Sequence, residues 1–325
     1  MTSVPQQANA ALDVVTFGEA MMLLVADTPG AIEDVHTFHK RTAGAETNVA
    51  IGLSRLGLRV GWASRLGTDS MGRYLLAAMQ GEGIDCSHVI CDATQRTGFQ
   101  FKGRVMDGSD PPVEYHRKGS AASQLGPDDI DVPWLQSARH LHATGVFPAL
   151  SAQTLAAARK TLDTMRAAGR TISFDPNLRP TLWATPDLMR DTLNDLARHA
   201  DWVLPGLAEG EFLTGQTTAQ GVARFYLDRG AKLVVVKLGA DGAYYEGVHA
   251  GRGVCGQVAG FPVETVVDTV GAGDGFAAGV ISGLLEGLPV ADAVRRGTWI
   301  GARAVQVLGD TEGLPTRTQL DAAGL

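Results

Sequence analysis

Residues 268–279 read Asp268-Thr269-Val270-Gly271-Ala272-Gly273-Asp274-Gly275-Phe276-Ala277-Ala278-Gly279. A β-prone run at 263–267 leads into this stretch, and apolar residues recur every fourth position from Phe276 onward, which predicts a helix. Gly271, Ala272 and Gly273 are therefore predicted to lie at a helix N-terminus, where backbone N–H groups and the helix dipole favour an anion. Asp274 follows directly, so the sequence predicts a carboxylate beside an anion site.

A carboxylate beside an anion site suits transfer of a phosphoryl group to a hydroxyl, because the carboxylate orients the hydroxyl and accepts its proton. The N–H groups would hold the charge that develops on the phosphate. A helix N-terminus is expected to lower the pKa of Asp274, so that this residue mainly positions the hydroxyl. A glycine turn followed by a capping aspartate is the simpler alternative.

Dinucleotide binding is a rival interpretation of the glycines. Residues 273–278 fit the spacing G-x-G-x-x-A, and residues 251–256 fit G-x-G-x-x-G. A second helix follows the first stretch where a strand is required, and no helix follows the second, so neither has the context of a dinucleotide site. The phosphate-binding pattern G-x-x-x-x-G-K-[ST] is absent from the sequence.

Strand-like and helical runs alternate along most of the chain. The predicted strands lie at 14–18, 60–64, 141–145, 171–175, 202–204 and 233–237. The predicted helices lie at 48–56, 71–80, 151–168, 186–199, 218–228, 273–286 and 290–308. Repeated β-α units of this kind predict an α/β fold with a parallel sheet covered by helices on both faces.

Two segments, at about 20–42 and 96–118, break this alternation. They contain alternating β-prone runs with no helix between them, so we expect a small antiparallel sheet that projects as a lid. No linker, repeat or low-complexity tract interrupts the chain, which predicts a single domain over residues 1–325 with this lid attached.

Composition excludes several classes of protein. Glycine contributes 40 of the 325 residues, yet 45% hydrophobic and 19% charged residues are globular values, and the glycines have no collagen period. A net charge of −7 without a basic cluster argues against a nucleic-acid partner, and no apolar run is long enough for a membrane helix. Three cysteines without a C-x-x-C pair favour a reducing cytoplasm over a disulfide framework or a zinc site.

A second motif, at 43–50, opens the helix predicted at 48–56. Glycine followed by asparagine at a helix start can direct a polar side chain and backbone N–H groups at sugar hydroxyls. The residues proposed to do so are Gly44, Ala45, Glu46 and Asn48. A glycine turn with ordinary helix capping is the alternative for this segment alone.

The two motifs, in this order and at this separation, resemble the two signatures of the ribokinase-like (PfkB-type) carbohydrate kinases. The resemblance extends over nearly the whole chain from Asp13 onward. It implies a doubly wound, mostly parallel α/β domain with a β-sheet lid, and a kinase that uses ATP and Mg²⁺. It also implies that Asp274 is the catalytic base and that the amides of Gly271, Ala272 and Gly273 form the anion hole.

Two further segments bear on the substrate, because each offers an arginine to the predicted crevice. Residues 115–120 read Tyr-His-Arg-Lys-Gly-Ser at the end of the lid, and residues 175–183 read Asp-Pro-Asn-Leu-Arg-Pro-Thr-Leu-Trp after a strand. A carboxylate can use paired guanidinium groups, since arginine binds it in a bidentate manner. Surface or salt-bridging roles for Arg117 and Arg179 are the alternative.

The residue patterns of these two segments resemble those of the 2-keto-3-deoxygluconate kinases within this family. Carried over to this sequence, the resemblance implies sugar-acid contacts from Gln100, Tyr115, Arg117, Arg179 and Asp310. It implies a nucleotide site lined by Asn177, Lys237, Gly239, Gly242 and Thr298. It also implies that Glu209 organises the Mg²⁺ region through water, with K⁺ as a further cofactor to consider.

Three positions depart from the family pattern. Gly206 stands three positions before Glu209, where the family pattern has an asparagine. Gln100 stands where related sequences have a substrate-contacting tyrosine, and Thr298 stands where an asparagine beside the nucleotide is common. Gln100 leaves 2-ketogluconate or fructose open as the substrate, and a non-catalytic sugar or nucleotide sensor is a third reading. The exposed β edges of the lid favour a homodimer or higher homo-oligomer.

Overall fold

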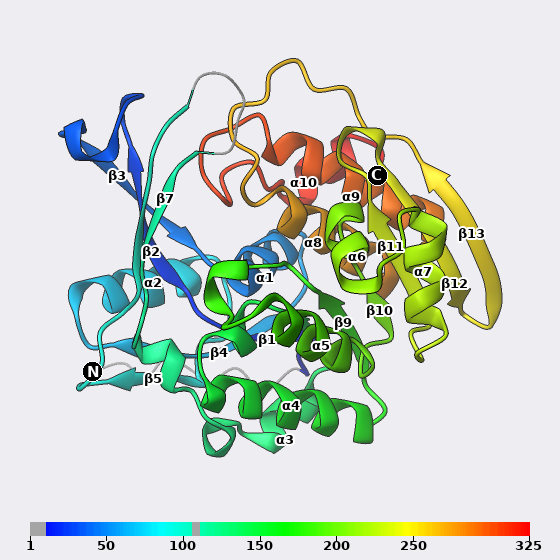
Figure 1. Ribbon diagram of the computed structural model, residues 1–325, viewed down its shortest axis with the longest axis horizontal. Coiled ribbons are helices and arrows are strands. Elements are labelled where there is room, and N and C mark those ends of the chain that lie inside the picture. Colours follow the sequence, from blue (N-terminus) through cyan, green and yellow to red (C-terminus); the bar gives the residue numbers. More distant parts are fainter. Residues whose placement is uncertain (1–10, 106–110) are drawn as a thin grey trace, which may run out of the picture.

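A nine-stranded sheet runs through the molecule, whose computed structural model describes residues 11–105 and 111–325 (Figure 1). Its strand order is β13-β12-β11-β10-β9-β8-β1-β4-β5, and all neighbours from β11 to β5 pair in parallel. The strands of this sheet are β1 (Val14–Phe17), β4 (Val60–Gly67), β5 (Val89–Asp92), β8 (His140–Thr144), β9 (Thr171–Asp175), β10 (Trp202–Val203), β11 (Leu233–Lys237), β12 (Ala243–His249) and β13 (Arg252–Val258). The mostly parallel sheet predicted from the sequence is thus confirmed.

The chain reverses its direction across the sheet between β1 and β8. From β1 it adds β4 and β5 on one side, whereas β8, β9, β10 and β11 build outward on the other. In open α/β sheets, ligands bind at the carboxyl ends of the strands beside such a switch point. The segments that follow β1, β8 and β9 therefore belong to the expected binding region.

Helices cover both faces of the sheet, and each face has its own apolar core. One core contains side chains of α1 (Ala45–Arg55), α2 (Ser70–Gly81), α8 (Ala272–Leu285), α9 (Val290–Ala304) and α10 (Arg317–Ala322). The other contains side chains of α3 (Val132–Ser137), α4 (Ala152–Ala167), α5 (Pro186–Ala197), α6 (Leu207–Thr214) and α7 (Ala219–Leu227). The central strands are buried on both sides, as expected for their nearly continuous apolar sequence. None of the described helices is long and apolar enough to cross a membrane.

Close packing of α8 on α9 accounts for several of the glycines. A Cβ atom added to Gly279 would lie 2.6 Å from the Cα of Gly297, and one added to Gly297 would lie 2.7 Å from a methyl group of Val280. The two helix backbones approach each other only because both positions lack a side chain. This contact fixes α8, and with it the turn that carries the first motif.

The lid is a separate four-stranded sheet in the order β3-β2-β6-β7, seen at the left of Figure 1. Its strands are β2 (Met21–Ala26), β3 (Phe38–Ala43), β6 (Phe99–Lys102) and β7 (Val113–His116). The prediction of an antiparallel sheet is only partly right, because β2 and β6 pair in parallel. Each of the two lid segments forms its own antiparallel pair, and the pairs join through strands that run in the same direction. Residues 106–110 of the second segment lie outside the described residues.

Two elements differ from the sequence prediction near the end of the sheet. The hairpin of β12 and β13 was not predicted, and the β-prone run at 263–267 forms no strand. Pro262 precedes that run, and the N–H groups of Val267 and Asp268 do not pair with a strand but are both directed at the carbonyl oxygen of Val305, at the end of α9. The approach to α8 is therefore an irregular loop rather than a strand.

His140 and His142 flank Leu141 in β8 and therefore lie on one face of the strand, and both are fully buried. The Ser173 hydroxyl lies 2.8 Å from Nε2 of His140 and 2.9 Å from Nδ1 of His142. Burial lowers the pKa of His142 to about 3, aided by the charge of Lys237, and burial also places the pKa of His140 well below its usual value. Both rings are therefore neutral in the folded protein.

This histidine pair predicts acid-sensitive folding. As the pH falls below about 6.5, both histidines become protonated in the unfolded chain but stay neutral in the folded protein. Each histidine therefore lowers the free energy of unfolding by about 1.4 kcal/mol per pH unit. We expect the urea midpoint to fall between about pH 7.5 and pH 5, and to fall less steeply in His142→Gln. An identical slope in this variant would show that His142 does not contribute.

Candidate active site

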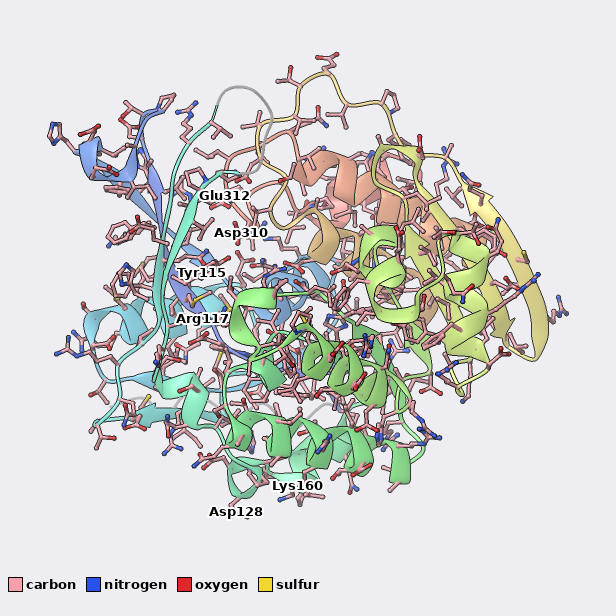
Figure 2. All side chains as sticks on the ribbon, in the orientation of Figure 1. Tyr115, Arg117, Asp128, Lys160, Asp310 and Glu312 are labelled. Carbon is pink, nitrogen blue, oxygen red and sulfur yellow. The ribbon has the colours of Figure 1, made fainter. Side chains whose placement is uncertain are left out.

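A cleft of about 540 Å³ lies between the lid and the carboxyl ends of the central strands. It brings together most of the residues singled out in the sequence, although they come from all parts of the chain. They are Gly44, Ala45, Asn48, Gln100, Tyr115, Arg117, Asn177, Arg179, Glu209, Lys237, Gly271, Gly273, Asp274 and Asp310. Figure 2 shows Tyr115, Arg117 and Asp310 near one another where the lid meets the body of the molecule.

Asp274 lies in the first turn of α8 and is only 7% exposed. Its Oδ2 accepts a hydrogen bond from the Asn48 side-chain amide at 2.8 Å, and its Oδ1 accepts one from the Asn177 amide at 3.3 Å. Asn177 adopts a positive φ of 41°, a conformation that asparagine tolerates better than most residues. Two asparagines from distant segments thus orient one carboxylate toward the cleft.

The pKa of Asp274 is shifted in the direction opposite to the one expected from the helix N-terminus. Burial raises this pKa to about 8, reinforced by the negative charges of Asp175 and Asp310 and opposed by Asn48 and Arg179. Desolvation and neighbouring carboxylates outweigh the helix dipole here, because the dipole effect is worth little more than about 1 kcal/mol. Asp274 is therefore a stronger base than the sequence suggested.

The turn before α8 has the geometry of an anion site. Gly271 caps the helix with a left-handed backbone (φ 84°), and the helix starts at Ala272. A Cβ at Gly271 would lie 2.3 Å from the carbonyl oxygen of Asp310, so only glycine fits. The N–H groups of the first helical turn have no partner within the helix, and those near Gly273 face the cleft, whereas Ala272 is not among its lining residues.

A buried ion pair holds a positive charge beside this turn. Lys237, at the end of β11, donates to Oδ2 of Asp175 at 2.6 Å, and its Nζ lies 3.6 Å from the position of a Cβ at Gly273. Burial opposes the charged form, yet the carboxylates of Asp175 and Glu209 raise the pKa of Lys237 above its usual value. The ammonium is thus retained next to the anion site, where it can contact a phosphate.

The two predicted carboxylate-binding arginines differ in their surroundings. Arg117 is 8% exposed and already paired, with its Nε and Nη2 at 2.6 and 2.5 Å from Oε2 of Glu19. Ser120 also donates to Glu19. Arg179 has no ion-pair partner in the part of the chain that the structure describes, and its Nη1 donates only to the carbonyl oxygen of Leu178 at 2.8 Å. Arg179 is therefore the guanidinium best placed to receive an anionic substrate.

Two cleft side chains present acceptors that nothing among the described residues satisfies. They are Oδ1 of Asn48 and Oε1 of Gln100, in residues that are 2% and 4% exposed. Buried polar atoms are normally hydrogen-bonded, so unpaired acceptors that face a cleft are suited to the hydroxyl groups of a ligand.

Glu46 is not among the residues that line the cleft, so its predicted contact with the sugar stays a prediction. It is 1% exposed, its Oε1 accepts from the Thr144 hydroxyl at 2.6 Å, and its carboxylate packs against Gly18. The helical period of α1 explains the difference, because residues two positions apart lie on different faces of a helix. Asn48 faces the cleft and Glu46 faces the core.

The predicted nucleotide residues lie only partly at the cleft. Gly239 and Gly242 follow β11, and the Thr298 hydroxyl donates to the carbonyl oxygen of Arg295 on α9 at 2.8 Å. None of the three lines the cleft. Their role in nucleotide binding therefore stays a prediction.

Glu209 caps α6 and also reaches the cleft. Its carboxylate accepts from the N–H of Gly206 at 2.7 Å and of Leu178 at 2.8 Å. Within residues 11–105 and 111–325, no group of three or more His, Cys, Asp or Glu side chains is arranged to hold a metal ion. The remaining lone pairs of Glu209 suit a metal-bound water, which is the indirect role predicted for it.

Sequence reasoning missed three charged residues of this region, namely Glu19, Lys102 and Asp268 as ion-pair partners. Glu19 follows β1 at the switch point, a position that could have identified it. Lys102 pairs with Asp268 and Asp310, which lie more than 160 residues further along the chain. No local pattern marks such pairs.

Comparison with known proteins shows that the chain is similar to carbohydrate kinases of one family. The family model for the pfkB family carbohydrate kinases matches residues 11–317. A 2-dehydro-3-deoxygluconokinase of Bacillus subtilis (strain 168) is 51% identical over 310 residues, which span 95% of this chain and 94% of the relative. A solved PfkB protein from Polaromonas sp. JS666 is 74% identical, covers 96% of this chain and 100% of its own, and superposes with a TM-score of 0.88. A putative ribokinase II from E. coli, solved with ATP and Mg²⁺, is 27% identical, covers 96% and 98% of the two chains, and has a TM-score of 0.86.

Proposed function

Since the chain belongs to the pfkB family of carbohydrate kinases, we propose that it transfers the γ-phosphoryl group of ATP to the primary hydroxyl of 2-dehydro-3-deoxygluconate. The product would be the 6-phosphate. The observation that carries this proposal is the buried carboxylate of Asp274 at the start of α8, in a cleft that also presents Arg179, a guanidinium with no ion-pair partner among the described residues. The similarity to a 2-dehydro-3-deoxygluconokinase supports the same sugar acid.

In the proposed reaction, the protein positions the hydroxyl and stabilises charge. Asp274, held by Asn48 and Asn177, accepts the proton of the attacking hydroxyl. The amides at the start of α8 and the ammonium of Lys237 stabilise the charge on the transferred group. ATP with Mg²⁺ supplies the phosphoryl group and neutralises its charge when bound, and Glu209 would hold the metal's water.

The sugar end of the cleft accounts for the proposed acid. Arg179 provides a guanidinium for the carboxylate, whereas Asn48 and Gln100 provide acceptors for hydroxyl groups. Closure of the lid over the sugar would exclude water and limit hydrolysis of ATP. We further propose a single domain that works in the cytoplasm and associates as a homodimer through lid edges.

The direct test is product analysis. Incubation with ATP, Mg²⁺ and 2-dehydro-3-deoxygluconate is expected to yield ADP and one sugar phosphate, with the phosphorus coupled to the C6 protons in NMR spectra. ADP released without a sugar phosphate, or a phosphate on another hydroxyl, would contradict the proposal.

The raised pKa of Asp274 predicts the pH dependence of activity. Only the deprotonated carboxylate accepts a proton, so kcat/KM should rise with pH and level off above about 8, falling about tenfold per pH unit below that. A rate profile between about pH 6 and pH 9 measures this directly. A flat profile over this range would place the pKa of the base near the ordinary value for aspartate.

Gly271→Ala tests the turn before α8. A methyl group would meet the carbonyl oxygen of Asp310 in a left-handed backbone, so we expect a loss of about 1–3 kcal/mol in stability and about 100-fold in kcat. Gly273→Ala is the control for stability, since its methyl group meets nothing closer than Lys237 at 3.6 Å. Equal melting temperatures for the two variants would refute the assigned geometry.

A further inference from the structure

A lysine of the lid reaches into the body of the protein beside the phosphate-binding turn. Lys102 ends β6 and is fully buried, with its Nζ 2.5 Å from Oδ2 of Asp268 and 3.0 Å from Oδ1 of Asp310. Asp268 and Asp310 are themselves 2% and 4% exposed. A buried ammonium with two carboxylates is costly to desolvate and is retained only where the pairing is close.

Asp268 connects this ammonium to both loops that form the turn. Its Oδ1 accepts from the N–H of Val270 at 3.1 Å, and its Oδ2 accepts from the N–H of Gly309 at 3.1 Å. Asp310 follows Gly309, and its carbonyl oxygen lies against Gly271. The position of Lys102 therefore fixes the loop before α8 and the 309–310 loop relative to each other.

The charge of Lys102 also matters for an anionic substrate. Asp268, Asp274 and Asp310 place three carboxylates around a turn that must accept phosphate, which carries negative charge itself. Burial alone would lower the pKa of Lys102, but the carboxylates of Asp310 and Asp268 raise it, so the ammonium stays charged. One positive charge thus offsets two negative charges behind the anion site.

We propose that Lys102 serves as a tethered monovalent cation, supplied by the lid, that neutralises Asp268 and Asp310 and holds the turn at 268–271 ready for phosphoryl transfer. Lys102 is fully buried and is not among the residues that line the cleft, so it is a positioning residue. The inference rests on the proposed kinase function. Lys102 thus adds a residue from the lid to those that support the motif at 268–279, although it lies 166 positions from Asp268 in the sequence.

Chemical rescue tests the tethered cation. In Lys102→Ala, kcat should fall by at least about tenfold, and n-propylammonium should restore it by roughly fivefold or more while n-propanol should not. Lys102→Met, which keeps the length without the charge, should lose the same activity. Lys40→Met removes an exposed lysine from the same lid sheet and should stay within about twofold of the wild type. A folded Lys102→Ala with near-normal kcat, or with a loss that the amine cannot restore, would overturn the proposal.

A double variant covers the case in which the single variants do not fold. Lys102→Met with Asp268→Asn removes one positive and one negative charge together, so a folded protein is expected, with kcat still at least about tenfold down. A folded double variant with normal kcat would overturn the proposal. The kcat of each variant is compared with that of the wild type, both measured with the sugar that the wild type phosphorylates fastest. If the wild type does not phosphorylate 2-dehydro-3-deoxygluconate, the proposed substrate is refuted, but the role of Lys102 is still tested with the other sugar.

Discussion

Asp274→Asn is expected to lower kcat by about 10²- to 10⁴-fold, because the amide cannot accept the proton of the attacking hydroxyl. The side chain keeps its size, so binding of both substrates should change little. Asp187→Asn, at a carboxylate with 78% of its side chain exposed, is a matched control that should leave kcat unchanged.

The same substitution should not cost stability. The folded pKa of Asp274 is raised to about 8, so the folded state gives up this proton less readily than the unfolded chain, and stability falls as the pH rises from about 4 to about 8. An asparagine avoids this ionisation, so the melting temperature at neutral pH should stay level or rise. A large loss of kcat with a matching loss of melting temperature would mean that Asp274 is structural, and full activity would exclude it as the base.

Arg179→Ala is expected to raise KM for 2-dehydro-3-deoxygluconate by about 10- to 100-fold, since a charge-assisted hydrogen bond to the carboxylate is worth roughly 1.5–3 kcal/mol. KM for a neutral sugar such as fructose should change little. Steady-state kinetics with both sugars measure the two KM values separately. An equal change in KM for both sugars would show that Arg179 does not bind the carboxylate.

Arg117→Ala provides the contrast, because Arg117 is already engaged. Removing it leaves the buried Glu19 carboxylate with the Ser120 hydroxyl but without its positive partner, which costs about 3–5 kcal/mol. We therefore expect Arg117→Ala to lower the melting temperature far more than Arg179→Ala does. The reverse order would place the substrate carboxylate at Arg117.

Local sequence was sufficient to predict the helix and the strands on which the candidate active-site residues lie. The 268–279 motif predicted the start of α8, and the alternation of strands and helices predicted the parallel sheet. Both follow from short-range signals, namely glycines at a turn and apolar periodicity. Asn177 and Lys237 reach the cleft because β9 and β11 end at one edge of the parallel sheet, whereas Gln100 and Tyr115 reach it from the lid.

Properties that depend on distant neighbours were not predictable in this way. The pKa of Asp274 depends on burial and on Asp175 and Asp310, which no local pattern relates to it. The pairing of Arg117 with Glu19 joins residues 98 positions apart, so local sequence could not decide between a carboxylate-binding and a salt-bridging role for Arg117. Glu46 is a third example, since the motif at 43–50 predicts where a helix starts but not which of its side chains face the cleft.

The measurement that tests the central claim most directly is the ratio of kcat/KM for 2-dehydro-3-deoxygluconate to that for fructose, with ATP and Mg²⁺ at the pH optimum. If Arg179 binds the carboxylate of the sugar acid, this ratio should be at least about 100. Equal values for the two sugars would contradict the assignment of a sugar-acid kinase, while leaving the family and the fold in place.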